Sequence, residues 1–439
     1  MGAILVQRAW LGGESLANDV RIEMDDGVIT AIEPAGSSDG ARSMPGVALP
    51  GLVNAHSHAF HRLLRGRAHQ QGGDFWAWRD RMYETAAALT PDSYEELATA
   101  VYTEMAMAGI TTVGEFHYVH HQDGGQPYED PNEMGHALVR AARRAGIRLC
   151  LLDAAYFTSG FTGEPLTPVQ ERFSDGSADR WLERVGDLWD IYGEASDVRI
   201  GLAPHSVRAV PESDLRAVSD THAAALPLHI HLSEQPAENL ACLETTGVTP
   251  TGLLERVGLL SQTTTAVHAT HVNAADIAKL GASGTGVCYC ATTERDLADG
   301  IGPSGDIRDA GVPLSVGSDS HAVIDLFEET RGVEMHERLK SGRRGVFAPT
   351  ELARIATYNG ARSLGFEGSH LEVGKPADIT IVSRETPRTQ TAGDDIGAIL
   401  YCATASDVTD VIVGGNQIVS GGHHPAWEMA RKSLTDPLG

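Results

Sequence analysis

Short apolar runs alternate with amphipathic stretches through the middle of the chain. The runs have the length and β-branched composition of strands buried on both faces, whereas stretches such as 93–108, 132–145 and 328–339 repeat apolar residues with a helical period. Strands that alternate with helices form parallel sheets. Eight such runs predict a (β/α)₈ barrel of the TIM type, with strands at 47–54, 111–117, 148–154, 198–203, 227–232, 265–269, 286–290 and 313–317.

The two ends of the chain have a different pattern. Residues 4–34 alternate apolar and polar positions around a turn at 25–27, and the segments 376–382 and 408–419 do the same. Such segments are typical of hairpins in a small antiparallel sheet. We therefore expect a small β-sandwich domain assembled from residues 1–47 and 371–439, the latter including a tail, beside a barrel of residues 48–370.

Composition narrows the class of protein. The 439 residues include 34 Lys and Arg against 59 Asp and Glu, which gives a net charge of −25. This charge opposes nucleic-acid and anionic-membrane partners, which are bound mainly through basic residues. The chain has five cysteines, and this small, odd number argues against a secreted disulfide framework. We find neither a signal peptide nor a membrane span in the sequence. We expect reduced thiols and a cytoplasmic location.

Polar clusters follow four of the predicted barrel strands. They contain His56 and His58 after the first strand, His231 and Glu234 after the fifth, His268 after the sixth and Asp319 after the eighth. The carboxyl ends of barrel strands open into one mouth, so these side chains should meet there. Three imidazoles and a carboxylate, with a position left for water, suit one catalytic divalent metal ion. The ligands we predict are His56, His58, His231 and Asp319.

In this order, these residues resemble the amidohydrolase superfamily of metal-dependent hydrolases and deaminases. The resemblance extends to the terminal β segments, through Gly-Lys-Pro-Ala-Asp at 374–378. Many members bridge two metals with a carboxylated lysine on the third or fourth strand. Here the lysines all follow the fifth strand, at Lys279, Lys340, Lys375 and Lys432. We therefore expect a mononuclear site, with Zn²⁺ as the first choice over iron and manganese.

Glu234 and His268 are the candidates for proton transfer beside this ion. A carboxylate at the position of Glu234 can pass a proton to a leaving nitrogen, and the deaminase branch of the superfamily carries a glutamate here. His268 would polarise the attacking water or stabilise the intermediate, and a role in orienting Asp319 is the alternative. Asp319 is expected to accept the proton of the water, so all three residues are predicted to be catalytic.

Basic and aromatic residues follow the first, second and fourth strands, in the segments 75–83, 115–121 and 203–210. Arginine binds carboxylates through paired, charge-assisted hydrogen bonds. In a chain with a charge of −25, basic groups gathered at one mouth predict a small acidic substrate.

These three segments, together with 58–60 and 291–294, closely resemble the formimidoylglutamate deiminase family of bacterial histidine degradation. That family hydrolyses N-formimidoyl-L-glutamate to N-formyl-L-glutamate and ammonia. Position by position, the resemblance implies that Arg81, Tyr118, His205 and Arg208 contact the carboxylates of this dicarboxylate. We also expect His61 to bind substrate: it stands where members of that family carry a glutamine, and its imidazole can still donate one hydrogen bond. Related barrels often pair, which makes a homodimer the oligomer to expect.

Two alternatives remain open from the sequence. The first is a deaminase of the same superfamily that acts on an aromatic ring, such as guanine, adenosine or a cytosine-like base, with the same metal ligands and Glu234. The second is a non-catalytic scaffold built on this barrel, like the dihydropyrimidinase-related proteins. Such scaffolds tend to lose metal ligands, and every expected ligand is present in this chain.

Overall fold

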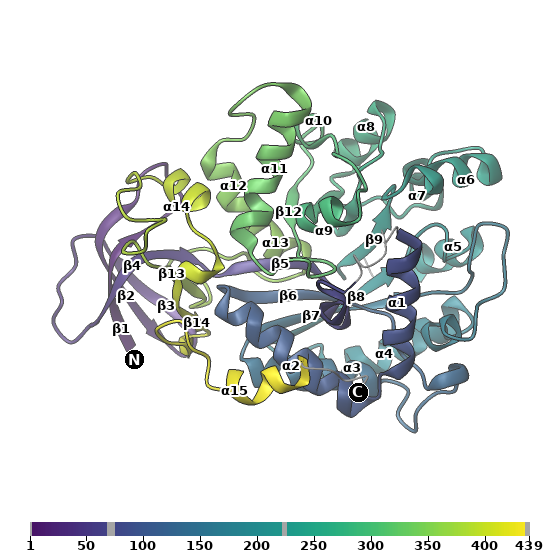
Figure 1. Ribbon diagram of the computed structural model, residues 1–439, viewed down its shortest axis with the longest axis horizontal. Helices are drawn as coiled ribbons and strands as arrows, with labels where there is room; N and C mark the ends of the chain where they lie inside the picture. Colours follow the sequence, from purple (N-terminus) through teal and green to yellow (C-terminus); the bar gives the residue numbers. More distant parts are fainter. Residues whose placement is uncertain (1, 68–74, 222–225, 435–439) are drawn as a thin grey trace.

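A computed structural model describes residues 2–67, 75–221 and 226–434, which form a barrel with a smaller sheet at one end (Figure 1). The eight barrel strands pair in parallel and in chain order. This arrangement confirms the predicted (β/α)₈ barrel. Its strands are β5 (Leu52–Ser57), β6 (Ile110–His117), β7 (Arg148–Ala155), β8 (Val198–Pro204), β9 (Leu228–Leu232), β10 (Thr264–His268), β11 (Gly286–Tyr289) and β12 (Leu314–Val316).

The barrel closes where its first strand meets the loop after its last. The amide of Asp319 donates to the carbonyl of His56 at 3.0 Å, and the amide of His58 donates to the carbonyl of Asp319 at 3.2 Å. Nearby, the Asn54 side chain donates to Ser318 Oγ at 2.7 Å and accepts from the Ser318 amide at 2.9 Å. This closure brings residues from opposite ends of the barrel sequence to one point.

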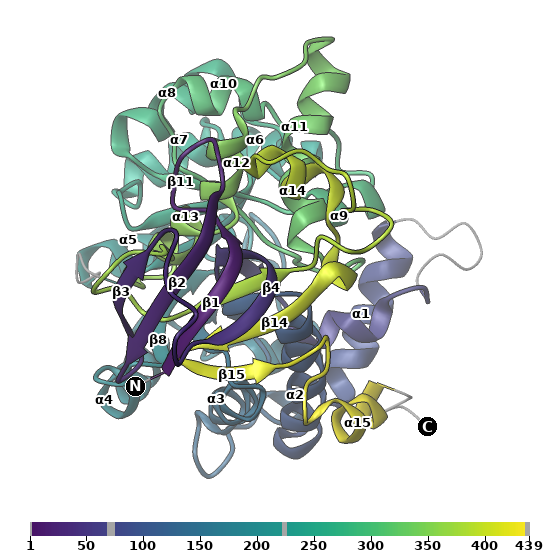
Figure 2. The same ribbon diagram turned by 90° about the vertical axis from the view of Figure 1, so that its left-hand side faces the viewer.

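The second sheet combines the two ends of the chain (Figure 2). Its strand order is β15-β14-β13-β4-β1-β2-β3, and β13 pairs antiparallel with β4. The expected sandwich is thus one continuous seven-stranded sheet, with its own cluster of buried residues. The strands are β1 (Gly2–Ala9), β2 (Ala17–Asp25), β3 (Val28–Glu33), β4 (Arg42–Pro50), β13 (Ile379–Val382), β14 (Val408–Val413) and β15 (Asn416–Val419).

The run predicted as the first barrel strand, 47–54, is divided between the two sheets. Strand β4 ends at Pro50 and its Val47 pairs with Val382 in the small sheet, whereas β5 starts at Leu52 in the barrel. Gly51 joins them, and a Cβ at this position would lie 2.1 Å from Thr111 Oγ1. An unbroken apolar run therefore hides a change of sheet that a single glycine permits.

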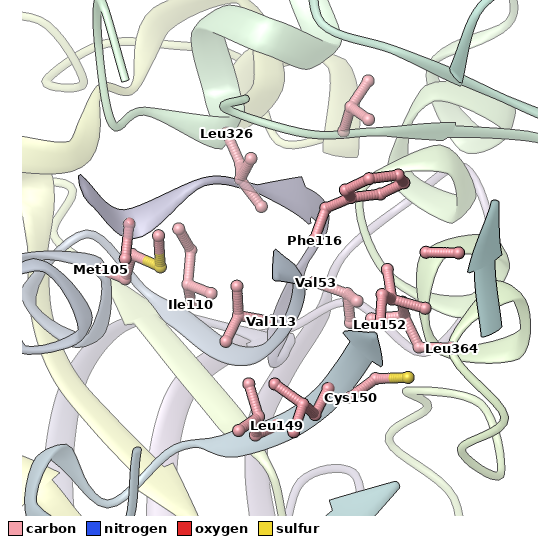
Figure 3. Close-up of a cluster of buried hydrophobic side chains, with 14 of the residues drawn as sticks. Val53, Met105, Ile110, Val113, Phe116, Leu149, Cys150, Leu152, Leu326 and Leu364 are labelled. Atoms are coloured by element: carbon pink, nitrogen blue, oxygen red, sulfur yellow. The ribbon is translucent and has the colours of Figure 1, made fainter. Parts of the chain in front are cut away.

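Helices surround the barrel and pack on its strands. Three of them match the predicted helices within two residues, namely α2 (Pro91–Met107), α3 (Glu133–Ala145) and α11 (Leu326–Ser341). Figure 3 shows Met105 of α2 and Leu326 of α11 in the same buried cluster as Val113 of β6. The other helices are α1 (Phe75–Ala88), α4 (Ala178–Tyr192), α5 (Glu212–Thr221), α6 (Pro236–Thr246), α7 (Pro250–Val257), α8 (Ala274–Ser283), α9 (Ala291–Asp296), α10 (Ser304–Asp309), α12 (Pro349–Ile355), α13 (Tyr358–Ser363), α14 (Ile396–Cys402) and α15 (Trp427–Ala430).

Two further properties bear on the environment of the protein. Within the described ranges, every helix is too short or too polar to cross a bilayer. The five cysteines are free thiols, four of them buried and Cys402 half-buried.

Candidate active site

Four predicted ligands converge at the carboxyl ends of the first, fifth and eighth barrel strands. His56 Nε2 lies 3.2 Å from His231 Nε2, while Asp319 Oδ1 lies 3.5 Å from His56 Nε2 and 3.4 Å from His58 Nε2. All four side chains are buried. Atoms arranged around an ion at about 2.0–2.1 Å in a tetrahedron are about 3.3–3.4 Å apart. The observed separations therefore fit a single bound ion.

The hydrogen bonds of the histidines turn their lone pairs toward this point. His58 Nδ1 donates to the carbonyl of Phe116 at 2.9 Å, and His231 Nδ1 donates to the carbonyl of His205 at 2.9 Å. Because a carbonyl only accepts, each Nδ1 carries the hydrogen and each Nε2 keeps its lone pair. Burial also lowers the pKa of both imidazoles well below the usual value, which favours their neutral form. Neutral imidazoles held from behind in this way are typical metal ligands.

Asp319 completes the donor set as a carboxylate. Burial alone would raise its pKa, but the hydrogen bond with His56 and the neighbouring imidazoles outweigh burial and hold the pKa below its usual range. Its backbone has a φ of +43°, and His268 and Ser233 have φ values of +71° and +52°. Left-handed backbone at residues other than glycine is costly and occurs where the surrounding structure demands it, often at functional sites.

His268 lies beside the donor set, with carboxylates around its ring. Its Nε2 is 3.8 Å from Glu234 Oε1 and 3.8 Å from Asp319 Oδ2. Burial would lower the pKa of His268, but Glu234, Glu294 and Asp319 together raise it well above the usual value. Glu234 keeps 21% of its side chain exposed and reaches the open side of the site. The two predicted proton-transfer groups thus face each other beside the metal ligands.

A pocket opens over these residues. Most of the predicted site residues line it, namely His58, His61, Tyr118, His205, Arg208, His231, Glu234, His268 and Asp319. His56 lies behind the pocket wall, fully buried, and Arg81 is not among the lining residues. Residues that the sequence did not single out also line the pocket: Trp78, Arg79, Met82, Tyr83, Tyr156, Ser159, Gln170, Phe173 and Leu297.

Helix α1 presents Arg79, and not the predicted Arg81, to the pocket. The Arg81 side chain is 54% exposed and lies 3.4 Å from Glu84 on the same helix. The pocket-lining residues of α1 are Trp78, Arg79 and their partners one helical turn later, Met82 and Tyr83. The signal for the correct arginine was therefore the i, i+4 spacing within this segment.

Arg208 supplies a second guanidinium group to the pocket. Its Nε is buried and has no hydrogen-bond partner within the described residues. Although burial disfavours the charge, Tyr156, Glu238 and Glu234 keep the pKa of Arg208 above its ordinary value. Across the pocket, Gln170 donates to the hydroxyls of Tyr156 and Tyr83 at 2.9 and 3.0 Å. The pocket thus contains a cationic hydrogen-bond donor, Arg208, and a hydrogen-bonded group of polar side chains around Gln170.

His61 is a neutral side chain of the pocket wall. Burial lowers its pKa to about 3. Its Nε2 lies 2.8 Å from the hydroxyl of Tyr118, and its ring packs edge-on against Trp78 with centroids 5.3 Å apart. His61 therefore links Tyr118 to the helix that carries Arg79.

A second histidine cluster has a structural explanation. His117, His120 and Asp153 are close enough to share a metal ion. However, Arg184 donates to both oxygens of Asp153 at 2.7 and 2.8 Å, and His120 Nε2 donates to the carbonyl of Ala154 at 2.8 Å. Asp153 and His120 Nε2 are thus already engaged with the protein, and His117 Nε2 lies 3.3 Å from His120 Nδ1.

Comparison with known proteins agrees with this geometry. The model of the amidohydrolase family matches residues 47–418, and the formimidoylglutamate deiminase of Pseudomonas aeruginosa is 37% identical over 100% of this chain and 99% of its own. The chain belongs to the amidohydrolase family. A 5-methylthioadenosine/S-adenosylhomocysteine deaminase from Haloarcula marismortui is 29% identical over 91% of this chain and 88% of its own. The crystal structure of an amidohydrolase from Brucella melitensis superimposes with a TM-score of 0.92, at 31% identity, and covers 100% of this chain and 99% of that one.

Membership in the family defines the general chemistry. This amidohydrolase is a hydrolase that acts on carbon–nitrogen bonds, of the deaminase type. Members of the family depend on a bound metal, and the converging histidines and Asp319 provide groups that can hold one here.

Proposed function

We propose that this amidohydrolase is a formimidoylglutamate deiminase, which converts N-formimidoyl-L-glutamate and water into N-formyl-L-glutamate and ammonia. The observation that carries the proposal is that two arginines, Arg79 and Arg208, line the same pocket as Glu234 and three of the four proposed metal ligands. A substrate with two carboxylates at one end and an imino nitrogen at the other matches this division of the pocket. The Pseudomonas aeruginosa relative, which bears this name, supports the same substrate.

The charge of the pocket favours a dicarboxylate over an aromatic base. Arg208 is half-buried, and its buried Nε has no hydrogen-bond partner within the described residues, in a chain whose net charge is −25. A buried donor without an acceptor is costly, and a carboxylate that accepts from it removes that cost through a charge-assisted hydrogen bond. A purine or pyrimidine ring offers no anionic group to two guanidinium ions, so it can make only weaker, neutral hydrogen bonds with them.

Zn²⁺ is the ion we propose for His56, His58, His231 and Asp319, because three imidazoles and one carboxylate are common zinc ligands. Such an ion supplies Lewis acidity, which makes a water molecule nucleophilic near neutral pH and polarises the bond under attack.

The residues of the chain provide the positioning and the proton transfers. Arg79 and Arg208 hold the carboxylates and thereby place the imino carbon near Asp319 and Glu234. As the oxygen of water bonds to this carbon, Asp319 accepts one proton of the water, the carbon–nitrogen double bond becomes a single bond, and Glu234 delivers a proton to the terminal nitrogen. Asp319 then passes its proton to the same nitrogen, and Glu234 takes back the proton of the new hydroxyl group as the carbon–oxygen double bond forms. The carbon–nitrogen bond breaks, and ammonia leaves with the bonding electron pair.

An ammonia-release assay tests this function. Purified protein loaded with Zn²⁺ is given N-formimidoyl-L-glutamate, N-formimidoyl-L-aspartate, guanine or adenosine in parallel. We expect the highest kcat/KM with N-formimidoyl-L-glutamate. A higher kcat/KM with guanine or adenosine would assign the protein to the ring deaminases instead.

A further inference from the structure

The ring of His268 has a second carboxylate behind it, on the side away from the pocket. Glu294 of α9 is 2% exposed, and its Oε1 lies 3.6 Å from His268 Nδ1. This Nδ1 is buried and has no partner within hydrogen-bond distance among the described residues. Glu294 does not line the pocket, so its carboxylate faces the imidazole and not the substrate.

Glu294 is held in this place by the backbone. Its Oε1, the oxygen that faces His268, also accepts from the amide of Cys290 at 2.9 Å. Its helix is fixed at two further points: the Thr292 amide donates to Glu329 at 3.0 Å, and the Ser320 amide donates to Thr293 Oγ1 at 3.2 Å. The position of this carboxylate is therefore set by the residue after β11, by α11 and by the loop after β12.

A carboxylate behind an imidazole determines which ring nitrogen carries the hydrogen. Since a carboxylate only accepts, it favours the tautomer with the hydrogen on Nδ1 of His268. That tautomer leaves Nε2 to exchange protons on the side of Glu234 and Asp319, each 3.8 Å away. The same arrangement orients the catalytic histidine in hydrolases with a serine nucleophile, where the carboxylate stays ionised and does not touch the substrate.

We infer that Glu294 is a positioning residue of the reaction, which fixes the tautomer and the ring orientation of His268 through Nδ1. The inference rests on the proposed function only for the choice of assay substrate. Rates are therefore measured with whichever compound of the assay panel the wild-type protein hydrolyses, and each variant is compared with wild type on that compound.

Two substitutions separate the charge of Glu294 from its oxygen. Glu294→Gln keeps an acceptor oxygen for Cys290 and His268 but removes the charge, whereas Glu294→Leu removes both. We expect kcat to fall about 10-fold in the first variant and about 100-fold in the second, which is at or below the lower end of the roughly 10²- to 10⁴-fold that general acid–base catalysis contributes. KM should stay within about threefold of wild type, and the bound zinc should not change, because Glu294 touches neither the pocket nor the ion.

Glu329→Gln is the matched control. Glu329 is also a fully buried glutamate that holds α9, through the amide and hydroxyl of Thr292, but it does not face His268. We expect its kcat to stay within about threefold of wild type. An equal loss of kcat in Glu329→Gln and Glu294→Gln would show that both act by supporting the helix, and would overturn the inference.

A double-mutant cycle with His268→Gln tests whether Glu294 affects kcat through His268. If Glu294 acts through His268, adding Glu294→Leu to His268→Gln should lower kcat by less than about twofold. A further loss near 100-fold in this background would overturn the inference, as would a wild-type kcat in the single variant Glu294→Leu.

The tautomer can also be observed without any substrate. In protein labelled with ¹⁵N-histidine, the ring signals of His268 are assigned by their disappearance in His268→Gln. Spectra are recorded above the titration midpoint of His268, where its ring is neutral. There we expect shifts of the Nδ1–H form in wild type and a change toward the Nε2–H form in Glu294→Leu. Identical shifts in the two proteins would contradict the inference, even if every compound of the panel were inert and the proposed function had failed.

Discussion

Arg79 and Arg81 are two residues apart in α1, and this spacing separates them by about 200° around the helix. The substitution Arg79→Met or Arg208→Met should therefore lower kcat/KM for N-formimidoyl-L-glutamate by about 10- to 150-fold, the effect of losing one charge-assisted hydrogen bond of about 1.5–3 kcal/mol. Steady-state ammonia release measures this change.

Arg81→Met is the control for both arginine variants, because Arg81 is exposed beside Glu84. It should keep kcat/KM within about twofold of wild type. A larger loss in Arg81→Met than in Arg79→Met would restore Arg81 as the substrate contact.

A substitution of Glu234 can separate an effect on catalysis from an effect on substrate or metal binding. Glu234→Gln keeps the shape of the side chain but cannot deliver a proton, so we expect kcat to fall by about 10²- to 10⁴-fold. KM and zinc content should change little. Metal analysis of the same preparation shows whether the loss arises from proton transfer, and a wild-type kcat would exclude Glu234 from that role.

From the sequence, the types of residue that form the site could be predicted better than the directions in which their side chains point. Two histidines separated by one residue in an extended segment must point to the same side, so His56 and His58 could be paired from spacing alone. The segment 75–83 has little amphipathic contrast. Its i, i+4 pairs, Trp78 with Met82 and Arg79 with Tyr83, select Arg79 over Arg81 only once the segment is known to be a helix. Glu294 lies in a segment that shares the family resemblance, but no role could be assigned to it from the sequence, because that role depends on a contact with His268 of a different strand.

At the scale of elements, Gly317 limits how the last barrel strand approaches the first. A Cβ at this position would lie 2.7 Å from both Cβ and the carbonyl oxygen of His56. Gly317→Ala should thus displace His56 and reduce the zinc bound per chain. Metal analysis measures the zinc bound per chain, and ammonia release measures the accompanying loss of activity. Gly374→Ala is not a suitable control because its φ is +87°, whereas Gly186→Ala meets no atom within 4 Å and should bind zinc normally.

Arg184 of α4 fixes that helix to β7 through buried charges. It donates to Asp153 and, at 2.9 Å, to Asp175, and all three side chains are at most 7% exposed. Arg184→Met leaves two carboxylates without their cation and should lower the free energy of unfolding by about 3–5 kcal/mol at pH 7. Urea denaturation measures the change. The exposed pair of Arg143 and Asp197 is the control, and Arg143→Met should cost at most about 1 kcal/mol.

The same cluster predicts how stability depends on pH. Burial alone would raise the pKa values of Asp153 and Asp175, but Arg184 and the nearby histidines hold both below the ordinary value. The stabilisation is complete above the unfolded pKa of about 3.9 and is lost as pH falls toward the lower folded values. Wild type should therefore lose stability more steeply than Arg184→Met below about pH 4. Parallel slopes in urea denaturation across this range would contradict the assignment.

Element boundaries depend on contacts that the sequence does not display. The barrel strands after the first could be located because loops and helices separate them. Strands β4 and β5 have only Gly51 between them, so the run 47–54 looked like one strand. Whether such a run stays in one sheet is decided by its partners, here Val382 for β4 and β6 for β5.

At the scale of the whole molecule, removal of the metal should weaken both activity and stability. A ligand that binds only the folded state at 1,000 times its Kd stabilises that state by about 4 kcal/mol. Treatment with a chelator should abolish ammonia release and lower the melting temperature, and added Zn²⁺ should restore both. In His231→Ala, added Zn²⁺ should restore neither to the wild-type level. Full activity of chelated wild-type protein, with no metal detected, would refute a metal-dependent site.

The closure of the barrel has a consequence for the time at which the enzyme first becomes active. His56 and Asp319 meet only after the final strand has docked against the first, so a nascent chain still waiting for that strand holds an incomplete set of donors. The complete set of four protein ligands is therefore available only in a chain whose barrel has closed.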